Sequence, residues 1–158
     1  MKLRLLWAAM SATAALVAFV VIGPASASPP SGATTTLISR ATFTGGYDVN
    51  VDGIKVKIKG PVDVATIEVD FQPGGTTGWH SHPGATFVQV KSGTVTRVNA
   101  DGCLSDSFNA GQGFFEQPNA VHEAVDNSSA PAVTIVTFIV PVGAPLRIDQ
   151  PPPPNCTP

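Results

Sequence analysis

Apolar and polar residues alternate along short segments of the chain, and glycine and proline separate these segments. The clearest segment is 54–59 (IKVKIK), in which every second residue is lysine. Successive side chains of a strand point to opposite faces, so this pattern predicts a half-buried strand with a solvated lysine face. Residues 62–71 alternate in the same way, and residues 73–75 (PGG) predict a turn after them.

Five further segments are apolar or rich in β-branched residues, and we expect strands at 86–91, 95–98, 113–116, 121–125 and 132–140. Turn residues lie between these segments at short, fairly even intervals. No amphipathic helix is evident after residue 27. Many short strands with turns rich in glycine and proline are typical of an all-β sandwich or barrel.

The first 27 residues read as a signal peptide. Lys2 and Arg4 precede an apolar run over residues 5–22, and small residues lead up to Ala27. We expect cleavage near Ala27, a secreted or extracytoplasmic mature protein, and no stable membrane span after cleavage. An uncleaved membrane anchor is the alternative, but the run is shorter than the ~20 apolar residues that a spanning helix prefers.

Length and charge narrow the class further. The 158 residues suit one domain. The chain has nine basic and eleven acidic side chains, and cleavage would remove Lys2 and Arg4, leaving a net charge of −4. Nothing resembles a basic groove, so we expect no nucleic-acid partner.

Both ends of the mature chain are rich in proline. Residues 28–36 predict a flexible lead-in, residues 37–147 the folded domain, and residues 148–158 an extended tail. Outside the cytoplasm a cysteine pair favours a disulfide, so we expect Cys103 and Cys156 to tie the tail to the domain. Two free thiols are the alternative.

The chain has three histidines, and His80 and His82 are two residues apart, so they face the same side of an extended strand. They belong to the pattern Gly74-x5-His80-x-His82-x3-Thr86-x6-Gly93. This pattern resembles the first motif of the cupin family, G-x5-H-x-H-x3-E-x6-G. Thr86 stands where the family has glutamate.

The third histidine lies in a second pattern, Gly111-x5-Gln117-x-Asn119-x2-His122-x3-Asp126. It is similar to the second cupin motif, G-x5-P-x-G-x2-H-x3-N. Asn119 replaces a glycine, and asparagine tolerates the left-handed conformation that glycine adopts there. All three histidines therefore fall on histidine positions of the family.

The resemblance implies a single jelly-roll-like β-barrel of two antiparallel sheets with the site inside. It also implies one divalent metal on His80, His82 and His122. Imidazole suits Fe, Zn, Ni and Cu, and the missing glutamate disfavours Mn, which prefers oxygen ligands. Three histidines packed in the core without a metal are the alternative.

Thr86 is a poor ligand, which leaves three alternatives. The three histidines hold the metal with additional water, another acid supplies the charge, or the metal is weak or absent. Glu116 precedes the second motif, but a turn intervenes, so alternation does not tell where it points. Glu123 follows His122 and is expected to face away from the interior. Trp79 either lines the pocket with Thr86 and Glu116 or packs on the other side.

Two functions follow from the resemblance. The first is an exported cupin that uses its metal for dioxygenase-like oxidation, or isomerisation, of a small organic molecule. The second is a non-catalytic module that binds a small ligand or a metal. The fold hosts both enzymes and binding proteins, so it does not decide between them. A homodimer is a further expectation, because cupins often pair through their sheets.

Overall fold

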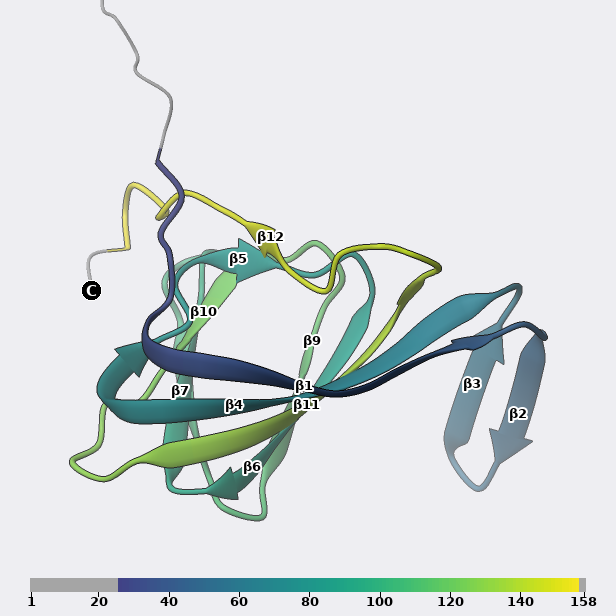
Figure 1. Ribbon diagram of the computed structural model, residues 1–158, viewed down its shortest axis with the longest axis horizontal. Helices are drawn as coiled ribbons and strands as arrows, with labels where there is room; N and C mark the ends of the chain where they lie inside the picture. The colour runs from purple at the N-terminus through teal and green to yellow at the C-terminus, as the bar shows by residue number, and fades with distance from the viewer. Residues whose placement is uncertain (1–25, 157–158) are drawn as a thin grey trace, which may run out of the picture.

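The computed structural model describes residues 26–156, and all regular elements in this range are β-strands. The strands are β1 (Ser31–Phe43), β2 (Tyr47–Val51), β3 (Ile54–Ile58), β4 (Val62–Thr76), β5 (His80–Ser81), β6 (Ala85–Ser92), β7 (Thr94–Asn99), β8 (Ser105–Asn109), β9 (Gly113–Glu116), β10 (His122–Val125), β11 (Ala132–Pro141) and β12 (Ile148–Asp149). The all-β prediction is confirmed (Figure 1). Residues 1–25, most of the predicted signal peptide, lie outside the described residues. Within the described range, no helix is long and apolar enough to cross a membrane.

Ten of the strands form one antiparallel sheet that wraps around a common interior (Figure 1). One half contains β1, β4, β11, β6 and β9, and the other contains β12, β5, β10, β7 and β8. β10 meets β4 at a single residue pair, Val125 and Thr76. Buried residues from both halves, including Phe71, Val95 and Phe138, form one core cluster. This arrangement corresponds to the predicted jelly-roll-like barrel, with the two sheets joined at their edge.

β11 lies between β4 and β6 and shows how the sequence builds the core. Its even-numbered residues 132–140 are buried, and its odd-numbered residues are partly exposed. Strict alternation places one set of side chains inside the barrel. Phe138 is 2% exposed, and its ring centroid lies 5.1 Å from that of His82. The core therefore supports the histidines directly.

The N-terminal segment differs from the predicted flexible lead-in. β1 begins at Ser31, and residues 33–37 pair with β4 in regular register. Three consecutive threonines, 34–36, lie in this stretch. Threonine is β-branched and suits a strand, which outweighs the nearby proline and glycine. The backbone NH of Ser28 also donates to the carbonyl of Gln150 at 3.3 Å, so the start of the described chain contacts the tail.

The turn predicted at residues 73–75 lies inside β4 instead. Here Gly75 lets β1 and β4 approach closely, since a Cβ at this position would overlap the carbonyl oxygen of Gly32. The register shifts between Ser31 and Ala33. Proline and glycine therefore mark an irregularity near the end of β4 rather than a reversal of the chain.

Strands β2 and β3 form a separate hairpin that projects from the barrel (Figure 1). The strand predicted at 54–59 is confirmed, but its half-burial is wrong, because only Ile58 is partly covered. The register pairs apolar residues with each other, and together they make the apolar hairpin face: Tyr47, Val49, Val51, Ile54, Val56 and Ile58. The opposite face carries Asp48 paired with Lys57.

The C-terminal segment is tied to the barrel at two places. Cys103 and Cys156 form a disulfide, as predicted. Ile148 and Asp149, assigned to the tail by the sequence, form β12 and pair with Ser81 and His80 of β5. The two-residue strand was too short to be predicted from its own pattern. It brings the C-terminal segment directly over the first cupin-like motif.

Candidate metal centre

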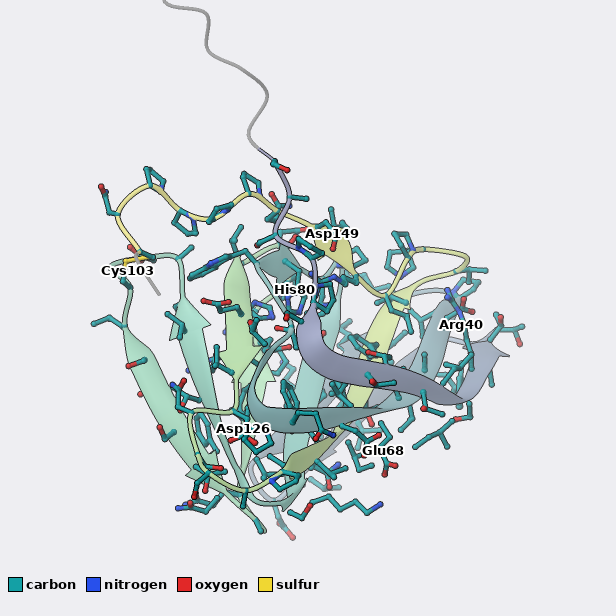
Figure 2. The ribbon with its side chains drawn as sticks, turned by 60° about the vertical axis from the view of Figure 1, so that its left-hand side comes forward. Arg40, Glu68, His80, Cys103, Asp126 and Asp149 are labelled. Carbon is teal, nitrogen blue, oxygen red and sulfur yellow. A yellow bond between two sulfur atoms is a disulfide. The ribbon has the colours of Figure 1, made fainter. Side chains whose placement is uncertain are left out.

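The three histidines converge inside the barrel from two neighbouring strands. His80 on β5 and His122 on β10 are direct partners in the sheet. His82 follows β5, and all three side chains are buried. Their ring centroids lie 4.5–5.1 Å apart, and one ring nitrogen from each lies within 4.8 Å of the others. Figure 2 shows His80 inside the end of the barrel that β12 covers.

Backbone carbonyls fix the orientation of every ring. The Nδ1 atoms lie 2.8 Å from the Gly78 oxygen for His80, 2.6 Å from the Leu146 oxygen for His82, and 3.0 Å from the Ala120 oxygen for His122. A carbonyl can only accept, so each Nδ1 carries the proton and donates it. In a neutral ring this leaves the Nε2 lone pair free to bind a metal, and such backbone partners are typical of metal-binding histidines.

A buried carboxylate lies beside two of the three histidines. Glu116 on β9 is 5% exposed, and its Oε1 and Oε2 lie 3.1 Å from His122 Nε2 and 3.2 Å from His82 Nε2. Two atoms bound side by side to one metal, each at about 2.0–2.1 Å, are about 3.0–3.4 Å apart. His122 Nε2 is also buried and makes no hydrogen bond. The three histidine nitrogens therefore fit a transition metal, and the Glu116 carboxylate lies beside two of them.

The charge states agree with this donor set. Burial lowers the pKa of His80 to about 2, and positive charge on His122, His82 and Arg147 acts in the same direction. Burial by itself raises the pKa of Glu116, but the adjacent His122 and His82 side chains outweigh it and lower the pKa to about 2. A neutral imidazole and an ionised carboxylate are the forms that bind metals.

A cavity of about 150 Å³ adjoins the cluster, and His80, His82 and Glu116 form part of its wall. Most of the remaining wall is apolar and includes Ile67, Val69, Phe71, Val88, Phe114 and Val136. Arg147 and the hydroxyl groups of Thr35, Thr77 and Thr134 are the other polar contributions. A site with a metal ligand set at one end and apolar walls elsewhere suits a small organic ligand.

Comparison with known proteins agrees with the two motifs. Residues 67–138 match the family model described as a cupin domain. This match and the observed fold support the resemblance to the cupin superfamily. The matched region contains all three histidines and Glu116. No curated protein is significantly similar to the chain in sequence.

Solved structures share the cupin fold at low sequence identity. An uncharacterized conserved protein with a double-stranded beta-helix domain from Klebsiella pneumoniae matches with a TM-score of 0.53 and 18% identity, over 77% of this chain and 84% of that chain. A recombinant oxalate oxidase in complex with glycolate matches with a TM-score of 0.50 and 23% identity, over 80% of this chain and 56% of that chain. Another oxalate oxidase structure, in complex with the substrate analogue glycolate, gives a TM-score of 0.47 and 27% identity over 54% of this chain. The chain spans 45% of the length of that protein.

The substitutions in the cupin motifs have structural counterparts. Asn119 has a φ of 61°, the left-handed conformation expected where the motif has glycine. Thr86, at the usual glutamate position, is fully buried and is the direct partner of Glu116 across β6 and β9. Its hydroxyl donates to the Gly84 carbonyl at 3.4 Å, and it is not part of the cavity wall.

The remaining predicted residues point elsewhere. Trp79 is buried but lines a separate pocket with Cys103, Cys156 and Glu123, so it is not part of the metal-side cavity. Glu123 faces away from the cluster as alternation predicts, and its Oε2 accepts a hydrogen bond from Thr76 Oγ1 at 2.8 Å. Of the three candidate pocket residues, only Glu116 lies in the cavity wall.

Two residues of the site were missed from the sequence. The Leu146 carbonyl orients His82, and Arg147 lies in the cavity wall. A backbone acceptor has no sequence signature. Arg147 had one weak signal in the sequence, since it is the only lysine or arginine after Arg97.

Proposed function

We propose that this cupin binds one divalent transition metal through His80, His82 and His122, with Glu116 as the fourth ligand, and oxidises a small organic molecule in the adjoining cavity. The observation that carries the proposal is the contact of one buried carboxylate with two histidine Nε2 atoms at 3.1 and 3.2 Å. Backbone acceptors already hold all three rings in place. These contacts support a metal site rather than core packing alone.

The presence of Glu116 changes the expected metals. The sequence disfavours Mn, because Thr86 replaces the glutamate of the family motif. Glu116 supplies a carboxylate oxygen next to His82 and His122, so that reason no longer applies. A three-nitrogen, one-oxygen set suits Fe, Mn, Zn, Ni and Cu, and the donor types alone do not select one of them.

The cavity favours oxidation over isomerisation. A bound metal of this class supplies Lewis acidity, and Fe, Mn or Cu also supplies redox chemistry. Proton transfer would need a free acid or base within reach of the substrate. In the wall of this cavity, the groups suited to that role are His80, His82 and Glu116, and all three belong to the metal set. The protein's own contribution is to orient the substrate against apolar walls and to exclude water.

The disulfide supports the proposal that the domain works outside the cytoplasm. Cys103 and Cys156 are bonded, and such bonds persist in oxidising compartments. A predicted signal peptide at residues 1–27 points the same way. Release of a mature chain beginning near Ser28 into the medium of a native-like host would test it.

Metal content per chain, measured by mass spectrometry on protein without a His tag, tests the metal site. We expect about one metal per chain in the wild type, little in His80→Ala/His82→Ala, and weaker binding in Glu116→Gln. Glu123→Gln is the matched control, because Glu123 is a buried carboxylate facing away from the cluster. Metal-free wild-type protein with an intact fold would overturn the proposal.

Oxygen uptake by the loaded protein then separates the two functions. Consumption of oxygen with small organic acids, phenols or thiols would support an oxidase or dioxygenase. Stoichiometric metal without turnover of any of these compounds would identify a binding module instead.

A further inference from the structure

One end of the cavity carries a positive charge that the metal site does not use. Arg147 belongs to the cavity wall, and it is the only permanently positive side chain among the wall residues. It lies on the C-terminal segment between Leu146, whose carbonyl orients His82, and β12. The same short segment therefore builds both the histidine support and this charged end.

Asp149 forms a salt bridge with one side of the Arg147 guanidinium group. Arg147 Nε donates to Asp149 Oδ1 at 2.5 Å, while the Asp149 side chain is 55% exposed. Figure 2 shows Asp149 on β12 at the same end of the barrel as His80. The Arg147 Nη2 atom is buried and has no hydrogen-bond partner in the described chain. A buried donor without a partner is unfavourable, so a ligand acceptor would satisfy it.

The charges around the cavity leave room for one negative charge. Arg147 and Asp149 balance each other, and a divalent metal with Glu116 leaves a charge of +1. A monoanionic ligand would neutralise the site. Arginine pairs well with carboxylates, because its planar guanidinium presents several donors in a fixed geometry.

The cavity limits the rest of the ligand. Its volume of about 150 Å³ and its apolar wall resemble an engineered cavity of similar size that binds benzene. We propose that the cavity binds a small monocarboxylate, with its carboxylate on Arg147 Nη2 and an apolar body no larger than about one six-membered ring beside His80 and His82. This inference deepens the proposed function, since it names the substrate class of the same site.

Binding of matched probes tests the inference. Benzoate and 2-methylpropanoate are compared with benzamide and 2-methylpropanamide by calorimetry, on metal-loaded wild-type protein and on Arg147→Gln. We expect at least one carboxylate to bind at least about tenfold more tightly than its amide, as expected for a charge-assisted pair. Arg147→Gln should remove this preference while metal content and melting temperature stay unchanged. Arg147→Lys should keep part of it, because lysine retains the charge without the planar fork.

Equal binding of acids and amides, binding of neither, or an unchanged preference in Arg147→Gln would overturn the inference. Asp149→Asn is the matched control, since it alters the exposed partner of Arg147 and should not weaken carboxylate binding. The metal proposal is tested separately. Carboxylate binding that depends on Arg147, in a folded wild-type protein that takes up no metal, would support the anion site and contradict the metal proposal. Metal binding without any preference for carboxylates would support the metal proposal and contradict the anion site.

Discussion

Thr86 and Glu116 are direct partners across the β6–β9 pair, so the residue missing from one strand of the cupin pattern is present on the next. Directly opposed residues of antiparallel strands point to the same face of the sheet. The carboxylate thus reaches the histidines from β9, and the small hydroxyl of Thr86 occupies the buried position that the family glutamate would fill.

Exchanging the two residues tests this relationship. Glu116→Thr is expected to weaken metal affinity by at least about tenfold, because even the loss of a group that only supports the metal ligands commonly costs 10–100-fold. Thr86→Glu/Glu116→Thr should recover most of the affinity, since it returns the carboxylate to the family position at nearly constant volume. Competition with a chelator would measure both. Thr86→Val is the control, and a double variant as weak as Glu116→Thr would contradict the exchange.

The environment of Asp63 leads us to expect that the folded protein becomes less stable in acid. Hydrogen bonds from Thr42, Gly143 and Arg40 lower the pKa of Asp63 from 3.8 to about 2. A lowered pKa in the folded state stabilises the fold above the unfolded value, and this contribution is lost as the pH falls from about 4 towards 2. Asp63→Asn should lower the melting temperature at pH 7 and flatten its decline between pH 4 and pH 2.

Asp48→Asn on the exposed hairpin is the control for this experiment, because Asp48 pairs only with the exposed Lys57. Melting temperatures of the wild type, Asp63→Asn and Asp48→Asn between pH 7 and pH 2 test whether Asp63 causes the loss of stability. The assignment to Asp63 would be wrong if Asp63→Asn and the wild type declined in parallel.

The disulfide should contribute to stability without supporting the metal site. Cys103 and Cys156 are 53 residues apart, and the chain-entropy model gives about 4 kcal/mol for a loop of this length. Cys103→Ser/Cys156→Ser is expected to lower the free energy of unfolding by up to this amount in urea titrations. Metal content should stay unchanged, since the disulfide lines a different pocket. Loss of metal in a folded double variant would show that the tail positions the site.

The apolar hairpin face allows a direct test of the expected homodimer. A lone two-stranded hairpin is marginal in water, and this one exposes nearly all of its apolar residues. The barrel also exposes Phe87 and Phe115, which pack together on the outside of β6 and β9. A second copy would cover such surfaces, so light scattering is expected to give the mass of a dimer.

Val49→Lys/Val56→Lys should shift that mass towards the monomer, because it places two charges on the apolar hairpin face. Asn50→Lys is the matched control on the opposite face, where it should leave the mass unchanged. A monomeric wild type would show that the homodimer expectation is wrong.

The sequence by itself determined the histidine set and six strands of the barrel: β4, β6, β7, β9, β10 and β11. Alternation is a local property, so it located β6, β9 and β11 closely. The spacing of His80 and His82 is likewise local, and the motif register linked them to His122. The same local rule was insufficient for β3, because alternation defines an apolar face but not what covers it.

Only the tertiary structure decided which other residues reach the site. The turn after β9 breaks the alternation between Glu116 and His122, so the direction of Glu116 depends on the pairing of β9 with β6. Arg147 and the Leu146 carbonyl reach the site because β12 pairs with β5, more than sixty residues earlier in the chain. Such contacts depend on strand register and loop paths, which arise from the packing of the whole barrel.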